Sequence, residues 1–163
     1  MISDGVNRLM KIGFNGDVVN AWKEVYRRSK NQPKAIIQQD LYNASVDDKC
    51  RAIFSYLVRN VSYKLDPYGN QYIKTPARLL EDGNGDCKSF TMFIASCLHC
   101  LHVPHIVRFV NFDGGNQYTH VYPVALDEYN NEIVLDACEL DARNRPLYNY
   151  ARKYAKKKDL LYE

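Results

Sequence analysis

The sequence has little of several features that would each mark a particular class of protein. It contains one tryptophan, five cysteines and a net charge of only +3 in 163 residues. No stretch approaches the ~18 apolar residues of a membrane-spanning helix. Residues 1–17 also lack the sustained apolar run of a secretory signal peptide. We therefore expect a cytoplasmic protein without a membrane segment, and association with a larger assembly stays open.

The small charge and the odd number of cysteines exclude further classes. Five cysteines fit a reducing compartment better than a disulfide scaffold. A net charge of +3 is too small to argue for nucleic acid. The one dense basic run, "RKYAKKKD" at residues 152–159, is interpreted as the solvated end of a helix. We expect no nucleic-acid and no membrane partner, and the sequence does not indicate an oligomeric state.

What is present is typical of an ordinary globular domain. Hydrophobic residues make up 46% and charged residues 25% of the chain. The length suits one domain, residues 1–163, with a core that needs no disulfide or metal. Within it we predict a helical N-terminal part over 1–44, a catalytic core over 45–138 and a C-terminal helix within 139–163.

The core predicts helices first and strands later. "SVDDKCRAIFSYLVRNV" has Ser45 as a plausible N-cap, and "TPARLLEDG" reads as a short helix from Thr75 to Gly83. Apolar residues recur at helical spacing from about Cys87 to His102. After Pro104, the stretches "HIVRFVNF", "QYTHVYPVAL" and "NEIVLDAC" are separated by turn sequences and predict an antiparallel meander. The fold class expected is α+β.

Cys87 stands in a setting that suits a nucleophile. It follows a Gly-Asn-Gly-Asp turn and opens the apolar helix, with Asp86 as the expected N-cap. The free N–H groups of a first helical turn stabilise a thiolate and could also hold an oxyanion. Gly83 and Gly85 would allow a tight turn and the approach of a substrate chain. The alternative is that Cys87 is a small buried hydrophobic residue.

His120 and Asp136 are the expected partners of that thiol. We place His120 in the middle of the second strand of the meander and Asp136 on the following strand, within an apolar run where a carboxylate needs a partner. If the intervening turn loops out residues 127–129, the two residues lie directly opposite each other; a turn of residues 127–131 makes them diagonal neighbours on one face. A four-residue turn would put them on opposite faces.

A second group of cysteines and histidines invites a metal interpretation. The run "CLHCLH" contains Cys97, His99, Cys100 and His102. Structural zinc usually draws its ligands from two separate segments, and the sequence has no second cysteine pair. We interpret this run as core and surface packing, and we expect neither a metal nor another cofactor.

The ordered motifs resemble those of the transglutaminase-like superfamily, which is related to papain-like cysteine peptidases. The segment "TPARLLEDGNGDCKSFTMFIASCLHCLHVPHIVRFV" is similar to the family's helix–turn–nucleophile–helix–strand unit, "THVYPVAL" to its histidine strand and "IVLDAC" to its aspartate strand. The resemblance covers about Asp47 to Cys138. It suits a compact bacterial or phage member, because 163 residues leave no room for the additional β-domains of the animal enzymes.

The resemblance implies a reaction and roles for three residues. Cys87 would attack an amide carbonyl to form a thioester, His120 would act as general base and acid, and Asp136 would orient His120. A protein or peptide is the implied substrate, and hydrolysis is expected rather than crosslinking. The tryptophan that supplies an oxyanion donor in animal transglutaminases has no counterpart beside Cys87, so Gln71 and Tyr72 are candidates for that donor.

Two functions are compatible with these motifs. The first is a cysteine hydrolase or peptidase in which Gly85, Asp86, Gln71 and Tyr72 line the oxyanion or substrate site. The second is a catalytically silent transglutaminase-like module that binds a partner or builds a phage or bacterial assembly. The presence of a cysteine, a histidine and an aspartate in the family's order favours the enzyme.

Overall fold

The computed structural model describes residues 9–12, 17–67 and 71–163. It shows an α+β fold, as expected, in which helices precede a four-stranded antiparallel sheet. The helical elements are α1 (Val18–Ser29), η1 (Gln32–Ala35), η2 (Gln39–Asn43), α2 (Val46–Asn60), α3 (Pro76–Asp82) and α4 (Cys87–Cys100). The strands are β1 (Leu9–Ile12), β2 (Ser62–Tyr63), β3 (Gln71–Lys74), β4 (Asn84–Gly85), β5 (His105–Asn111), β6 (His120–Leu126), β7 (Glu132–Val134) and β8 (Lys156–Tyr162).

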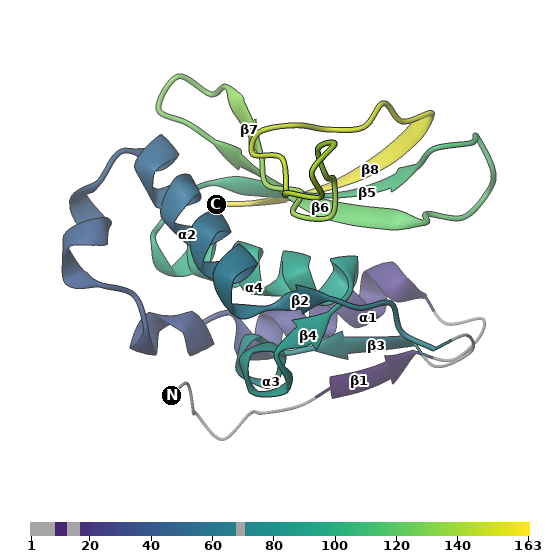
Figure 1. Cartoon of the computed structure of the whole chain (residues 1–163), viewed down its shortest axis with the longest axis horizontal. Helices are drawn as coiled ribbons and strands as arrows, with labels where there is room; N and C mark the ends of the chain where they lie inside the picture. Colours follow the sequence, from purple (N-terminus) through teal and green to yellow (C-terminus); the bar gives the residue numbers. More distant parts are fainter. Residues whose placement is uncertain (1–8, 13–16, 68–70) are drawn as a thin grey trace.

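The main sheet has the strand order β7-β6-β5-β8. Strands β5, β6 and β7 form the predicted meander, and every neighbouring pair is antiparallel. Figure 1 shows α4 lying between this sheet and a second group of elements that includes α1, α3 and the small β1–β3 sheet. Helix α2 packs beside α4 on the flank.

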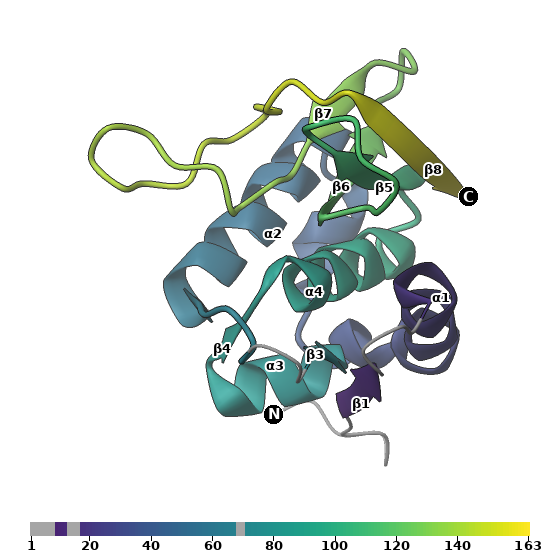
Figure 2. The ribbon, with the colours of Figure 1, turned by 90° about the vertical axis from the view of Figure 1, so that its right-hand side faces the viewer.

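Helix α4 is the centre of the core. Twelve of its fourteen residues are buried, because the sheet lies on one side of it and α1, α2, α3 and β3 pack around the rest. Figure 2 shows the same helix enclosed on several sides. A helix that is apolar almost all round is stable only when it is surrounded in this way. Asp86 caps its first turn, as predicted, and Pro104 follows shortly after its end.

The predicted helix caps around the core are confirmed. Ser45 caps α2 by accepting a hydrogen bond from the backbone N–H of Asp48. Thr75 caps α3, and Pro76 occupies the first helical position. Gly83 ends α3 in the left-handed conformation, with a φ of 71°. These local signals hold because each satisfies backbone groups that the helix itself leaves unpaired.

The predicted C-terminal helix is wrong. Residues 156–162 form strand β8, which pairs along the whole of β5. The edge of β5 offers a row of backbone hydrogen-bonding groups, and these outweigh the local helical pattern. Leu160 and Tyr162 then pack against the buried apolar cluster that contains Trp22, while the intervening Leu161 is exposed. This is the alternation of a strand.

The prediction of a helical N-terminal part is also only partly right. Helix α1 and the two short 3-10 helices are present, but residues 9–12 form strand β1, which pairs antiparallel with β3. Two further short strands, β2 and β3, lie between α2 and α3. The parts of this prediction that concern residues 1–8 and 13–16 lie outside the described residues. In the described part of the chain, no helix is long and apolar enough to cross a membrane.

Gly85 allows α3 and α4 to approach each other closely. A Cβ atom at Gly85 would lie 2.6 Å from Cδ1 of Leu79 and 3.1 Å from Cβ of Ser89. Leu79 is fully buried and cannot move aside freely. The requirement for glycine at this position therefore comes from helix packing next to the turn that precedes Cys87.

We expect Gly85→Ala to lower the free energy of unfolding by about 1–3 kcal/mol, because it overpacks this contact. The measurement is urea unfolding followed by circular dichroism. Gly83→Asn is the matched control: its Cβ would meet nothing within 4 Å, and asparagine tolerates a positive φ. Equal losses of stability in the two variants would contradict the packing explanation.

Candidate active site

Cys87 is the first residue of α4 and is half-buried. The side chain of Asp86 accepts a hydrogen bond from the backbone N–H of Lys88 at 3.1 Å, which fixes the start of the helix. The first turn of a helix leaves backbone N–H groups without an intrahelical partner and concentrates a partial positive charge there. The Cys87 sulfur therefore stands at the electropositive end of the most buried helix in the fold.

Two buried acids and a buried lysine reinforce this end of the helix. The Lys88 ammonium is hydrogen-bonded to the carboxylate of Asp86 and, at 2.7 Å, to the amide oxygen of Gln71. It also lies 3.7 Å from the carboxylate of Asp66. These side chains are nine-tenths buried or close to it. Because a buried charge without a partner is costly, the cluster holds β3 and the start of α4 in one arrangement.

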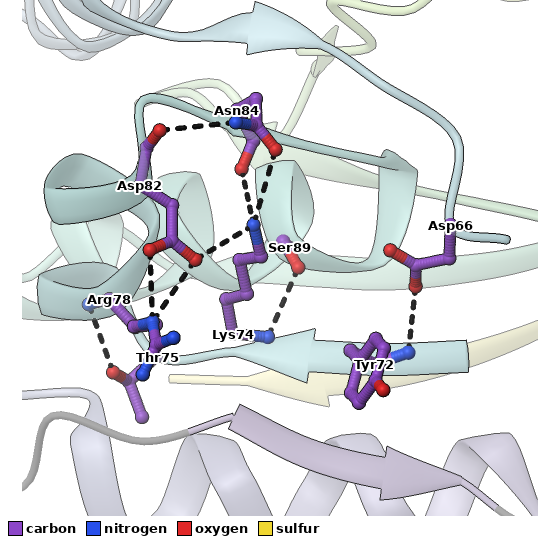
Figure 3. Close-up of polar contacts among 8 residues, drawn as sticks. All are labelled: Asp66, Tyr72, Lys74, Thr75, Arg78, Asp82, Asn84 and Ser89. Carbon is purple, nitrogen blue, oxygen red and sulfur yellow. Dashed lines mark hydrogen bonds and ion pairs between the residues drawn. The ribbon is translucent and has the colours of Figure 1, made fainter. Parts of the chain in front are cut away.

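A second buried lysine fixes the turn that leads into Cys87. Figure 3 shows the Lys74 ammonium between the α3 end and β4: it donates to the backbone carbonyl of Asn84 at 2.8 Å and pairs with Asp82 at 3.0 Å. The backbone N–H of Lys74 donates to the hydroxyl of Ser89, in the first turn of α4. Lys74 thus joins β3 to both sides of the turn that precedes the thiol.

The single tryptophan lies closer to this region than the sequence suggested. Trp22 is fully buried, and its indole N–H donates to the backbone carbonyl of Lys88 at 3.1 Å. Cys87 packs against the same apolar cluster. Since the indole N–H is already engaged with Lys88, Trp22 supports the start of α4 from within the core.

His120 and Asp136 are in direct contact. Nε2 of His120 lies 2.7 Å from Oδ2 of Asp136, and Asp136 is 2% exposed. The imidazole stacks on Phe112, with ring centroids 5.7 Å apart, and packs at a tilt against the ring of Tyr122. Because Nε2 is occupied by the carboxylate, Nδ1 is the ring nitrogen left to face a further partner.

The register of the hairpin explains how the pair forms. Leu126 pairs with Glu132 and Val124 with Val134, so the turn comprises residues 127–131. This is the five-residue alternative, which makes His120 and Asp136 diagonal neighbours on one face. Two details differ from the prediction: His120 is the first residue of β6 and not a mid-strand residue, and Asp136 lies just beyond the end of β7.

The electrostatics of His120 connect it to both other residues. Burial by itself lowers the pKa of His120, but hydrogen bonds and charge interactions with Asp136 and Cys87 more than compensate and raise it to about 10. The imidazole is therefore protonated at neutral pH. The structure thus brings Cys87, His120 and Asp136 together from the start of α4, the start of β6 and the segment after β7.

The other predicted site residues have well-defined surroundings. Gly85 packs against Leu79, and Asp86 is the N-cap of α4. The Gln71 side chain accepts a hydrogen bond from Lys88, whereas Tyr72 is held through its backbone N–H by Asp66 at 2.7 Å. Their part in holding an oxyanion or a substrate stays a prediction.

Tyr63 is a neighbour of the site that sequence reasoning missed. It pairs with Gly85 across the β2–β4 contact, two residues before Cys87. Its ring lies edge-on to Phe90, with centroids 5.7 Å apart, and it is 46% exposed. Cys87 and Phe90 are three residues apart and share a helix face. No local pattern marked this position, because the β2–β4 pairing joins segments more than twenty residues apart.

Cys138 is the second missed neighbour. Its backbone N–H donates to Oδ1 of Asp136 at 3.2 Å. Burial raises the pKa of the Cys138 thiol, and the charges of Asp136 and Cys87 and a hydrogen bond to Asp136 raise it further. The available signal was its position two residues after Asp136 in the sequence.

This chain belongs to the transglutaminase-like superfamily. The family model with that description matches residues 31–137, which include Cys87, His120 and Asp136 as well as helices α2 and α3. A comparison with curated proteins found no match.

Solved structures share the fold at low sequence identity. A proposed protease from Parabacteroides distasonis superposes with a TM-score of 0.62 at 13% identity, covering 74% of this chain and 26% of that one. EGTA-treated LapG from Legionella pneumophila gives a TM-score of 0.50 at 21% identity, over 83% of this chain and 73% of LapG. A proposed cysteine protease from Cytophaga hutchinsonii gives 0.45 at 14% identity, over 89% of this chain and 51% of that one. This chain thus spans about a quarter of the first protease and about half of the third.

The His120–Asp136 contact predicts a pH-dependent contribution to stability. A pKa raised from the ordinary ~6.5 to about 10 stabilises the folded state fully below pH ~6.5, and this contribution disappears as the pH rises through about 10. We expect the stability difference between wild type and Asp136→Asn to shrink by at least about 1.4 kcal/mol, one pKa unit, over that range.

The measurement is urea unfolding at several pH values between these limits. Asp48→Asn is the control, because Asp48 is an exposed acid in the first turn of α2. A difference between wild type and Asp136→Asn that stays constant with pH would show that the carboxylate does not hold a charged imidazole.

Proposed function

We propose that this chain is a cysteine hydrolase that cleaves amide bonds in proteins or peptides through a thioester intermediate. The observation that supports this most directly is the 2.7 Å contact between Nε2 of His120 and Oδ2 of Asp136, in an imidazole that also interacts with the Cys87 thiol at the start of α4. An imidazolium beside a thiol stabilises the thiolate, which is the nucleophilic form of cysteine. The membership of the transglutaminase-like superfamily agrees with this chemistry.

The proposed reaction has two stages. The Cys87 thiolate attacks the carbonyl carbon of the substrate, and the C=O electron pair moves onto oxygen. His120 then gives its proton to the leaving amine as the C–N bond breaks, which leaves a thioester on Cys87. In the second stage, water attacks the thioester while His120 takes a proton from it, and the acid leaves as the thiolate forms again. Asp136 holds the imidazole in the orientation that both proton transfers need.

The oxyanion formed in each stage needs hydrogen-bond donors. Free backbone N–H groups of the first turn of α4 are one source. We assign the second donor to the hydroxyl of Tyr63, because its ring lies along the face of α4 that carries Cys87 and its half-exposed position can reach a bound carbonyl. Burial, and then the nearby Cys87, Cys138, Asp86 and Asp136, raise the pKa of Tyr63, so the phenol keeps its proton. Gln71 would act indirectly, by holding Lys88.

The first test uses p-nitrophenyl acetate, an activated ester that offers a small acyl group without requiring a particular peptide. We expect a burst of p-nitrophenol, an acetyl thioester on Cys87 by mass spectrometry, and its subsequent hydrolysis. His120→Ala should slow the acylation by about 10²- to 10⁴-fold, the usual contribution of a general acid–base group. Cys87→Ala should remove the adduct altogether.

The buried thiols of Cys50 and Cys97 serve as internal controls, because burial raises the pKa of each and should keep both unmodified. The alternative function, a silent transglutaminase-like module that binds a partner, predicts a different result. In that case Cys87 reacts no faster than the same thiol in the urea-unfolded chain, and His120→Ala changes nothing.

The role of Tyr63 has its own test. Tyr63→Phe keeps the ring against Phe90 but removes the hydroxyl, so we expect acylation by the ester to fall by about 100-fold, the usual effect of losing one oxyanion donor. Alkylation of Cys87 by iodoacetamide forms no oxyanion, and its rate should be unaffected. Equal losses in both reactions would mean that Tyr63 only shapes the surroundings of the thiol.

A further inference from the structure

A second thiol stands at the His120–Asp136 pair, and the proposed mechanism does not use it. One ligand atom each of His120, Asp136 and Cys138 can be chosen so that all three lie within 4.8 Å of one another. The hairpin register brings the chain after β7 alongside the start of β6: Val124 pairs with Val134, and the backbone N–H of Leu135 donates to the carbonyl of Pro123. Cys138 lies in the turn that follows Asp136. In the described part of the chain, no other group of three or more histidine, cysteine or acidic side chains meets this distance.

We propose that His120, Asp136 and Cys138 form a binding site for a zinc ion, which occupies the site reversibly and competes with catalysis. An imidazole nitrogen, a carboxylate oxygen and a thiolate sulfur are the three donor types that zinc takes in proteins. Three such ligands leave a fourth tetrahedral position for water. The thiolate disfavours calcium and magnesium, which bind oxygen ligands.

The site is already assembled without rearrangement of the backbone. Asp136 is almost fully buried, and a hydrogen bond fixes the position of each of its carboxylate oxygens. Oδ2 lies 2.7 Å from Nε2 of His120, and Oδ1 accepts from the backbone N–H of Cys138. The ion would replace the proton shared between Nε2 and Oδ2. Zinc binding then releases that proton and the proton of the Cys138 thiol, so the affinity should increase with pH.

The other cysteine and histidine run in the chain lacks this convergence. Cys97 is buried, His99 contacts Asn31, and the Cys100 thiol donates to the backbone carbonyl of Lys30. Its side chains therefore point to separate partners. This run supplies a control, because it offers thiols and imidazoles close together in the sequence that do not converge on one point.

The consequence for catalysis rests on the proposed function, whereas the binding itself does not. A zinc ion on Nε2 of His120 and on Asp136 separates the imidazole from the carboxylate that orients it. Its positive charge on Nε2 also disfavours protonation of Nδ1, the ring nitrogen that would carry the proton for the leaving amine. We therefore expect zinc to inhibit acylation by p-nitrophenyl acetate and a chelator to restore it.

The experiment titrates the metal-free protein with Co²⁺, whose absorption reports both thiolate ligation and tetrahedral geometry, and then displaces it with Zn²⁺. We expect one ion per chain with a thiolate-to-cobalt charge-transfer band. Cys138→Ser, which nearly keeps the side-chain volume, should lose that band. It should also weaken Zn²⁺ binding by at least about 100-fold, because losing even a residue that only hydrogen-bonds a metal ligand lowers metal affinity by about 10- to 100-fold. Cys100→Ala should bind as the wild type does.

Cys87→Ala separates the zinc site from the proposed enzyme. It should keep the charge-transfer band although it has no nucleophile, so the binding result does not depend on whether the chain is a hydrolase. The proposal is overturned if the band disappears in Cys87→Ala but persists in Cys138→Ser, because the ion would then lie on the nucleophile. It is equally overturned if Cys138→Ser, shown by circular dichroism to be folded, binds Zn²⁺ as tightly as wild type.

Discussion

The enclosure of α4 is the constraint on which the rest of this structure depends. A helix with twelve buried residues out of fourteen cannot shift or rotate without disturbing the sheet on one side and the other helices around it. Its first residue is Cys87. The position of the thiol is restricted as well, because side chains in a densely packed core have few alternative positions. The packing of the apolar remainder of the helix therefore sets the position of its half-buried first residue.

Buried charges extend that rigidity to the residues around the thiol. Lys74 ties the turn before Cys87 to β3, and Lys88 ties the N-cap Asp86 to Gln71. A buried ion pair is weak evidence for stability, since desolvation offsets much of its attraction. Its value here is geometric: each ammonium has several fixed oxygen partners, and moving any of them would leave a buried charge unpaired. Both lysines are on segments adjoining the proposed nucleophile.

The opposite side of the site is built by a hairpin with one definite register. The five-residue turn between β6 and β7 brings Asp136 to His120, and Cys138 in the following turn lies close to both. The same geometry therefore supports two competing uses of one imidazole nitrogen, a proton shared with Asp136 and a metal ion bound by all three side chains. Which use prevails depends on the supply of protons and of zinc, and not on any movement of the backbone.

The sequence by itself determined the elements whose signals are local. Ser45, Thr75 and Asp86 cap helices because a side-chain oxygen satisfies nearby backbone N–H groups, and the α+β order follows from the change of apolar period after Pro104. Only the tertiary structure decided the contacts between distant segments. The free edge of β5 turned residues 156–162 from the predicted helix into a strand, and the β2–β4 pairing brought Tyr63 beside Cys87. The choice among the three hairpin registers also required the folded structure, because local turn chemistry permits several loop lengths whereas only packing against α4 selects one.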